Sequence, residues 1–410
     1  MKKDLERLMH DAGIDVLWVS GASSECPDIY YLTNGVSLTT AWVILRPGEK
    51  PLLCHSPMER KAASSSGCRT LDFSRLGADE LSRRHNDPVE VLFRMFERLV
   101  EIENLSGRLA VHGVMDPGEA HELLGALNRR LDGIEIVRVN PPALELARLT
   151  KDNKEIRKMK KVAASALEAL EAGLKIIRLA HPEGNRLVDS LGRPVTVGKV
   201  KEAILLALAE RDLHEAHRTI LSIGREAGIP HAVSSPETVL TTGRTVVLDL
   251  FPRQNGGGYF FDITRSFCIG HAPQEALKLY QEVLSAQQKA IAAIEPGMDG
   301  YNLQELVCDY FEGLGHSTNR SHPGTTEGYV HNLGHGVGLE IHEHPFLRLQ
   351  DTPEKYNRLQ PDSVFTIEPG LYYPERGMGI RIEDVVYLDS RGKAKILAPF
   401  KKFPVLELVG

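Results

Sequence analysis

Five side chains in the C-terminal half of the chain have types that suit a divalent metal site. They comprise two aspartates, two glutamates and one glycine-flanked histidine, namely Asp249, Asp262, His335, Glu368 and Glu383. Two divalent cations would neutralise the four carboxylates and would still acidify a water molecule held between them. Ligands that are mostly oxygen, with one nitrogen and no thiolate, favour hard or borderline ions such as manganese or cobalt over structural zinc.

The two aspartates are expected at the ends of a β-hairpin. Asp249 lies in a β-branched run that predicts a strand, and a Gly-rich turn follows. Asp262 lies thirteen positions later, where a second strand is predicted. Two unpaired carboxylates at short distance repel and raise each other's pKa, so this arrangement needs cations to keep both charged. For this segment alone, two unrelated aspartates at strand ends or turns are the alternative.

The two glutamates lie inside apolar runs that predict β-strands. Glu368 occurs in SVFTIEPG and Glu383 in GIRIEDVVYL, fifteen positions apart. Because side chains alternate along a strand, Arg381 and Glu383 are expected on the same face. A glutamate is disfavoured in such a setting unless it is paired or bound to metal, so an ion pair with Arg381 is the alternative for one of them.

The candidate histidine, His335, occurs in LGHGVGLEIH, where the flanking glycines let the backbone approach closely and expose the imidazole. A single histidine is more often a structural residue than a metal ligand. Four acids and a histidine in strand or turn contexts would need separate explanations, however, whereas one metal centre explains them together.

The bulk composition indicates a folded globular protein of about two domains. The chain has 410 residues, 42% of them apolar and 25% charged, with a net charge of −6. The absence of a Lys/Arg block argues against nucleic acid or an anionic membrane as the main partner. Five cysteines without CxxC spacing indicate reduced thiols. Because acids interrupt the basic N-terminus and no long apolar run occurs, we expect neither a secretion signal nor a membrane span, and a cytoplasmic location.

The first ~145 residues alternate between helical and strand patterns, which predicts an α/β domain around a mixed sheet. Two prolines and a cluster of helix-capping residues follow, so we place the domain boundary near residue 148. The predicted strands are 14–20, 41–47, 51–56, 108–113 and 135–139, with a predicted helix over 89–102.

The rest of the chain, 149–410, shows the order helix, helix, strands twice. The predicted helices cover 156–177, 197–212, 273–294 and 301–315. Each pair precedes a turn with Gly and His between apolar stretches. This doubling predicts an α+β domain with pseudo-twofold symmetry, in which helices pack outside a curved sheet.

At the motifs DITRSF, GHGVG, TIEPG and RIED, the sequence closely resembles the pita-bread metallopeptidases, the family of methionine aminopeptidase, aminopeptidase P, prolidase and creatinase. The resemblance covers about residues 150 to 410. It implies a pita-bread catalytic domain over 149–410, preceded by a creatinase-like α/β domain over 1–148. Methionine aminopeptidases in general lack such a preceding domain, which favours the subgroup that acts on Xaa-Pro peptides.

The resemblance assigns a role to each of the five ligand candidates. The position of Asp249 chelates one metal, and the positions of Asp262 and Glu383 bridge both. His335 and Glu368 correspond to the remaining ligands of the other metal. The implied cofactor is a pair of divalent ions, with manganese or cobalt expected.

Catalytic roles are implied for His231 in GREAGIPHA, His342 in LEIHEHP and Glu368. The family hydrolyses peptides with a water that the metals activate, and Glu368 is expected to accept its proton. His231 is expected to stabilise the oxyanion, and His342, with Glu368, to help protonate the leaving nitrogen. The implied substrate is a peptide with proline at the second position.

Further residues match positions around such a site. His331 resembles an extra histidine of aminopeptidase P and prolidase, and it is expected with His231 and His342 to contact substrate. Tyr259 is expected to line the same site. Thr264 and Arg381 are expected to hold the carboxylate ligands in place, since metal geometry generally requires such support.

The sequence departs from the family pattern at two places. The spacing from Asp249 to Asp262 is two residues longer than usual, which predicts an enlarged hairpin turn. Some prolidases have an arginine directly after the HExP proline to bind a dipeptide's carboxylate, but Phe346 occupies that place here. Arg348 is the candidate replacement. Two possibilities therefore stay open: a strict dipeptidase, and an aminopeptidase that acts on longer peptides.

The resemblance leaves two alternative functions open and implies an oligomeric state. A creatinase-like C–N hydrolase of a small molecule would keep the fold, although creatinase works without metal. A non-catalytic pita-bread binding module would be expected to have lost ligands. In relatives the N-terminal domain packs across a neighbouring subunit's active site, so a homodimer is expected.

Overall fold

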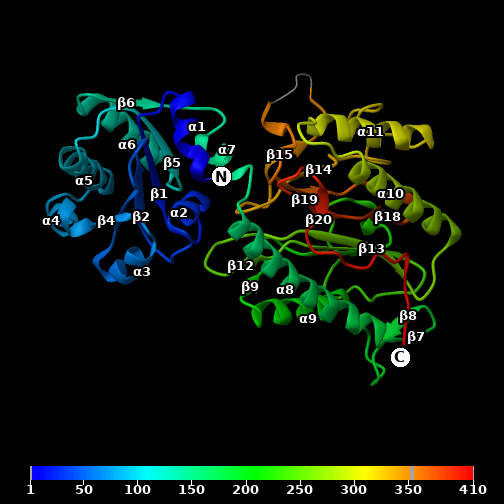
Figure 1. The fold of residues 1–410 in the computed structure, drawn as a ribbon. Helices are drawn as coiled ribbons and strands as arrows, with labels where there is room; N and C mark the ends of the chain where they lie inside the picture. Colours follow the sequence, from blue (N-terminus) through cyan, green and yellow to red (C-terminus); the bar gives the residue numbers. More distant parts are fainter. Residues whose placement is uncertain (1, 351–354, 410) are drawn as a thin grey trace. The chain divides into compact units, whose positions relative to one another are not determined.

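The computed structural model describes residues 2–350 and 355–409 (Figure 1). The chain forms two compact units. One comprises Met1–Arg148 with Asn255–Gly258, and the other comprises Leu149–Gln254 with Tyr259–Gly410. Among the helices described, none is both long and apolar enough to cross a membrane. All five cysteines are free.

The first unit is built on a six-stranded mixed sheet in the order β4-β3-β2-β1-β5-β6. The central strand β1 pairs antiparallel with β2 and parallel with β5, as a mixed α/β domain requires. Trp18 and Trp42 from these strands pack with Phe96 of helix α5. The predicted α/β class is confirmed.

The strands of this unit are β1 (Val16–Gly21), β2 (Ala41–Leu45), β3 (Leu52–His55), β4 (Arg69–Asp72), β5 (Gly107–Gly113) and β6 (Ile134–Val137). Its helices are α1 (Leu5–Asp11), α2 (Pro27–Leu32), α3 (Arg60–Ser65), α4 (Ala78–Arg84), α5 (Pro88–Glu103), α6 (Pro117–Arg130) and α7 (Ala143–Arg148). Short 3-10 turns are η1 (Lys2–Asp4), η2 (Pro57–Glu59) and η3 (Phe73–Leu76).

The second unit contains the four long helices that the periodicity predicts. The longest, α8, begins at a capping box in which Asp152 and Glu155 satisfy each other's backbone N–H groups. Their bounds are α8 (Asn153–Arg178), α9 (Val197–Ala209), α10 (Gln274–Ala292) and α11 (Gly300–Gly313). The 3-10 turns are η4 (Glu226–Gly228), η5 (Lys355–Asn357) and η6 (Pro374–Arg376).

Each helix pair precedes one mainly antiparallel set of strands, so the predicted doubling is present. After α8 and α9 comes the sheet β10-β11-β13-β21, and after α10 and α11 comes the sheet β15-β14-β16-β19-β20. The first sheet and its small neighbours comprise β7 (His181–Glu183), β8 (Arg186–Val188), β9 (Leu213–His214), β10 (Ile220–Ile223), β11 (Thr245–Leu250), β12 (Arg253–Gln254), β13 (Ile263–Ile269) and β21 (Val405–Leu406). The second set comprises β14 (Gly334–Gly336), β15 (Glu343–Leu347), β16 (Val364–Ile367), β17 (Gly370–Tyr373), β18 (Met378–Arg381), β19 (Asp384–Leu388) and β20 (Ala394–Ile396).

The prediction that both candidate glutamates lie within strands is wrong. Glu368 lies between β16 and β17, and Glu383 lies between β18 and β19. The chain changes sheets at these points, because β16 and β19 pair in the five-stranded sheet while β17 and β18 pair with each other. Pro369 follows Glu368 directly and cannot donate a hydrogen bond to a strand ladder. Both glutamates therefore sit at breaks, where a side chain can leave the regular alternation.

Candidate metal centre

The antiparallel pair β11 and β13 forms the predicted hairpin. Asp249 pairs with Thr264 across the two strands, and Asp262 directly precedes β13. The connection between the strands contains the short strand β12 and a Gly-rich turn. The extra residues between the two aspartates therefore lie in this connection and not in the paired part of β11 and β13. Both aspartates are buried and line one cavity.

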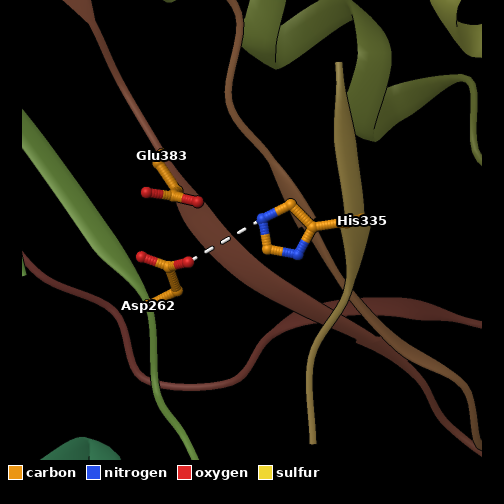
Figure 2. A group of neighbouring side chains, drawn as sticks. All are labelled: Asp262, His335 and Glu383. Carbon is orange, nitrogen blue, oxygen red and sulfur yellow. Dashed lines mark ion pairs between the residues drawn. The ribbon is translucent and has the colours of Figure 1, made fainter. Parts of the chain in front are cut away.

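Three of the five candidate ligands form a compact cluster. One ligand atom each from Asp262, His335 and Glu383 lies within 4.8 Å of the others. Figure 2 shows these side chains pointing toward one another from three different segments of the chain. The Nε2 atom of His335 lies 3.8 Å from Asp262 Oδ2 and 3.3 Å from Glu368 Oε1, so Glu368 lies beside the same cluster.

A cavity of about 540 Å³ connects these groups, a volume typical of small-molecule sites. All five candidate ligands contribute to its lining. So do four other residues that the sequence singles out: His231, His331, His342 and Arg381. The structure thus brings nine of the predicted site residues to one place from segments up to 152 positions apart, between His231 and Glu383.

Burial and mutual repulsion disfavour the charged forms of two carboxylates in the cluster. Burial, reinforced by the Asp249 charge, holds the pKa of Asp262 well above its usual range. Burial and the Asp262 charge do the same for the pKa of Glu383. Burial alone would lower the pKa of His335, but the hydrogen bond with Glu368 raises it to about 9. A divalent cation would remove this repulsion, since opposite charge favours the ionised carboxylates.

Unpartnered oxygens provide a direct test of whether the residues fit a metal. Oδ1 of Asp249 and Oδ1 of Asp262 are buried, and neither has a hydrogen-bond partner among the described residues. A buried carboxylate oxygen without a partner is costly, and buried charges are normally paired or bound to metal. The donor set and its unpartnered oxygens therefore fit divalent cations.

Two polar side chains fix the carboxylates in position. The hydroxyl of Thr264 donates to Glu383 Oε2 at 2.7 Å and accepts from Arg381 Nε at 3.1 Å. The same arginine donates through Nη2 to Asp249 Oδ2 at 2.6 Å. Thr264 and Arg381 thus link Asp249 on β11 with Glu383 at the break between β18 and β19.

Two histidines on the cavity wall, His331 and His342, differ from His335 in their charge. Burial lowers the pKa of His331 to about 4 and that of His342 to about 4, so both imidazoles are neutral near pH 7. The ring of His342 meets that of His335 edge-on, with centroids 4.2 Å apart. His331 Nε2 lies 2.9 Å from the hydroxyl of Tyr372. His231 is exposed at the same cavity.

Two predicted substrate contacts lie elsewhere. The residues that line the cavity in the described part of the chain include neither Tyr259 nor Arg348. The hydroxyl of Tyr259 donates to Glu155 Oε1 at 2.8 Å. The guanidinium of Arg348 lies 5.1 Å from the centre of the Phe346 ring. Each side chain is engaged by a neighbour, so the geometry does not favour the substrate-binding role that we expected for them.

The side chains of Gln287 and Tyr372, which the sequence analysis did not identify, form hydrogen bonds with residues of the site. Gln287 on α10 donates from Nε2 to the carbonyls of Ile367 and Ile382 at 3.0 Å each. These residues directly precede Glu368 and Glu383, the two candidate glutamate ligands. The signal available in the sequence was a glutamine on the apolar face of a helix. Tyr372, whose hydroxyl accepts from Arg381 Nη1 at 2.8 Å, carried no comparable signal.

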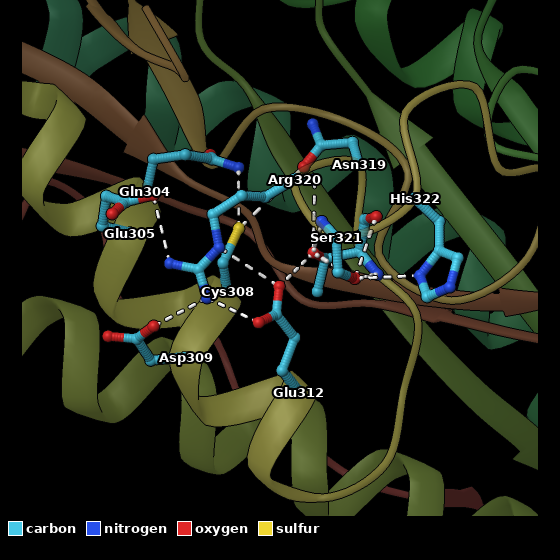
Figure 3. Close-up of polar contacts among 10 residues, drawn as sticks. Gln304, Glu305, Cys308, Asp309, Glu312, Asn319, Arg320, Ser321 and His322 are labelled. Atoms are coloured by element: carbon cyan, nitrogen blue, oxygen red, sulfur yellow. Dashed lines mark hydrogen bonds and ion pairs between the residues drawn. The ribbon is translucent and has the colours of Figure 1, made fainter.

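The loop that carries His331 is anchored to helix α11 by ionic and amide contacts (Figure 3). Arg320 of this loop pairs with three acids of the helix: Glu305, Asp309 and Glu312. Closer to the cavity, Gln304 Oε1 accepts from the backbone N–H of Leu333 and from the hydroxyl of Tyr329. These contacts hold the Tyr329 side chain and the Leu333 backbone, which lie on either side of His331 in the sequence.

Comparisons with known proteins agree with this geometry. The model of metallopeptidase family M24 matches residues 154–390. The Xaa-Pro dipeptidase of Pyrococcus furiosus is 28% identical over 317 residues, which are 77% of this chain and 81% of the relative. The Xaa-Pro dipeptidase of Pyrococcus horikoshii is 27% identical over 370 residues, 90% of either chain.

Solved structures show the same fold. The prolidase from Pyrococcus horikoshii superposes with a TM-score of 0.71 at 23% identity, over 98% of this chain and 99% of that one. The X-Pro aminopeptidase from Thermotoga maritima has a TM-score of 0.74 at 21% identity, over 98% of this chain and 100% of that one. The predicted pita-bread fold with its preceding α/β domain is confirmed. Since the family model covers more than half of the chain, the protein belongs to metallopeptidase family M24.

Proposed function

We propose that this metallopeptidase hydrolyses Xaa-Pro peptide bonds and that Asp249, Asp262, His335, Glu368 and Glu383 hold two divalent cations, manganese or cobalt. The observation that carries the proposal is the convergence of these five side chains on one cavity. Two relatives that match most of the chain are named Xaa-Pro dipeptidases, which supports the choice of substrate.

The bound cations would supply Lewis acidity and would make water a nucleophile at neutral pH. Glu368 is placed to accept the proton of the attacking water, since its carboxylate lines the cavity beside His335. Its hydrogen bond with His335 outweighs the effect of burial and lowers its pKa to about 2. It is therefore ionised at neutral pH. Its place at a break between strands lets the carboxylate face the cavity.

Three further histidines line the cavity and are assigned roles in the same reaction. His231, exposed at the cavity, is placed to donate a hydrogen bond to the developing oxyanion. His342, packed against His335, is placed to help Glu368 pass the proton taken from the water to the leaving nitrogen. His331 is assigned a substrate contact on the same wall. Because the proline nitrogen of an Xaa-Pro bond has no N–H, its recognition depends on the shape of the ring.

The domain roles, assembly and location are part of the same proposal. We assign residues 1–148 to a creatinase-like domain and 149–410 to the catalytic domain, in a cytoplasmic homodimer. The α/β unit that includes Met1–Arg148 supports the dimer, since such a domain pairs subunits in the family that the sequence resembles. Sedimentation should give twice the chain mass of 45.4 kDa, and a mass of one chain would exclude the dimer.

The test of the activity is manganese- or cobalt-dependent release of the first residue from Xaa-Pro peptides. We expect Asp262→Asn and His335→Ala to abolish it. Asp132→Asn is a matched control, because Asp132 is exposed and belongs to the other compact unit. If Asp262→Asn and His335→Ala stay as active as the wild type, the site assignment is wrong.

A further inference from the structure

The cavity that holds the candidate ligands also has a positively charged edge. Its lining includes two side chains that carry a permanent positive charge, Arg218 and Arg381. Arg381 is fully engaged, since it is buried and donates to Asp249, Thr264, Tyr372 and the Pro230 carbonyl. It cannot turn toward a ligand without releasing those groups.

Arg218 is in the opposite situation. It lies in the connection between β9 and β10, its side chain is exposed, and it borders the cavity. None of the hydrogen bonds and ion pairs of the described residues involves its guanidinium. An exposed arginine at a cavity edge with no internal partner has its five donors available for a ligand.

The nearest acid on the same connection does not neutralise this charge. Glu215 lies 3.7 Å from Lys201 Nζ and also accepts the backbone N–H of Thr219. Burial lowers the pKa of Lys201, and the Arg218 charge acts in the same direction. Glu215 is thus engaged by Lys201 and by the Thr219 backbone, which leaves the charge of Arg218 without a counter-charge on this connection.

The rest of the cavity sets the orientation of a charged ligand. The four carboxylates that line the cavity and are proposed to bind metal repel an anion until cations are bound. His217, Phe251 and Ile220 also line the cavity. The centroids of the His217 imidazole and the Phe251 ring lie 6.3 Å apart. A ligand that is apolar along its length and anionic at one end is complementary to this arrangement, with the anionic end at Arg218.

We propose that Arg218 binds the C-terminal carboxylate of short peptide substrates and so makes the site selective for them. The proposal rests on the proposed function, since it names the substrate class of the same site. A guanidinium matches a carboxylate through two parallel N–H···O bonds, and such charge-assisted pairs are among the stronger hydrogen bonds. The cavity of about 540 Å³ is of a size for a dipeptide or tripeptide.

The experiment compares Xaa-Pro dipeptides and Xaa-Pro-Yaa tripeptides, each as the free acid and as the C-terminal amide. The readout is the ratio of kcat/KM for acid over amide, at saturating manganese, in the wild type, Arg218→Gln and Arg218→Lys. Arg391→Gln is the matched control, since Arg391 is an exposed arginine outside the cavity lining. Circular dichroism confirms that each variant is folded.

We expect the wild type to prefer the acid by about tenfold through KM, a value that allows for the exposure of the guanidinium. Arg218→Gln should bring the ratio close to one, Arg218→Lys should retain part of it, and Arg391→Gln should keep the wild-type ratio. The peptide length with the larger ratio identifies the substrate whose carboxylate reaches Arg218.

Two negative results have different meanings. If the wild type cleaves acids and amides but Arg218→Gln leaves their ratio unchanged, the role of Arg218 is refuted and the proposed function stands. If the wild type cleaves neither acid nor amide with any divalent ion, the proposed function fails, and the role of Arg218 fails with it.

Discussion

Arg381 and Asp249 form a buried ion pair in which Nη2 donates to Oδ2 at 2.6 Å, with the residues only 3% and 7% exposed. Burial raises the pKa of Asp249, whereas the Arg381 charge opposes that effect. The pair leaves Oδ1 of the aspartate without a hydrogen-bond partner among the described residues. One oxygen is thus held in place by the protein while the other is available to a cation.

Arg381→Lys should weaken manganese binding by about 10- to 100-fold, because a lysine cannot reproduce the several directed contacts of the guanidinium. Isothermal titration of the metal-free protein measures the change. Arg391→Lys, an exposed replacement outside the cavity, should leave the affinity unaltered. Equal affinities for the wild type and Arg381→Lys would show that the arginine does not position a ligand.

Thr264→Val should remove the hydrogen bond to Glu383 Oε2 while keeping the shape of the side chain. Thr264 is fully buried, so the loss also leaves Arg381 Nε without its hydroxyl acceptor. We expect about 10-fold or greater loss of manganese affinity, with rescue by Thr264→Ser, which restores the hydroxyl. A valine variant that binds metal like the wild type would contradict this role.

Gln287→Leu should destabilise the protein and disturb both glutamate ligands. The amide of Gln287 joins the carbonyls of Ile367 and Ile382, and its loss leaves these buried acceptors without that donor. We expect a decrease of about 1–3 kcal/mol in the free energy of unfolding, together with weaker metal binding. Gln288→Leu, the exposed neighbour on the same helix, should change stability by less than about 0.5 kcal/mol. Similar effects of the two substitutions in urea unfolding would refute the bridging role.

Glu90 should make the stability of the protein depend on pH in acid. Its hydrogen bonds with Arg130, aided by Arg94, lower its pKa from an ordinary 4.5 to about 2. A carboxylate with a depressed pKa contributes stability above the unfolded value and loses it as pH falls through the folded value. Glu90→Gln should therefore cost about 1 kcal/mol at neutral pH, a figure reduced for the partial exposure of these side chains.

The measurement is urea unfolding of wild type and Glu90→Gln across this pH range. The difference between them should shrink as pH falls from 4.5 toward 2. Glu122→Gln, at an exposed position on α6, serves as the control. A difference that stays constant with pH would show that the ion pairs do not cause the shift.

Much of the site's framework could be predicted because the residue patterns are local. Helical periodicity predicts α8 to α11, and the alternation around Asp249 and Asp262 predicts their hairpin. The breaks at Glu368 and Glu383 could not be found in this way, since a strand that changes sheets has the same apolar pattern as an uninterrupted one. Pro369 was the one local indication of such a break.

Contacts between distant segments were beyond sequence patterns. Gln287 acts on Ile367 and Ile382, which lie 80 and 95 positions away, and no local rule predicts that pairing. The same limit explains why Tyr259 and Arg348 were expected at the cavity. The Tyr259 side chain contacts Glu155, and the Arg348 side chain contacts Phe346. Residue type indicated what these groups can do, but packing determined what they contact.

The most direct test of the account is the number of manganese ions bound per chain, measured by equilibrium dialysis alongside Xaa-Pro hydrolysis. We predict two ions for the wild type, a lower number for Asp262→Asn, and loss of activity both in that variant and after chelation. A wild type that remains active without divalent metal, or an Asp262→Asn variant with the wild-type metal content and rate, would contradict the account.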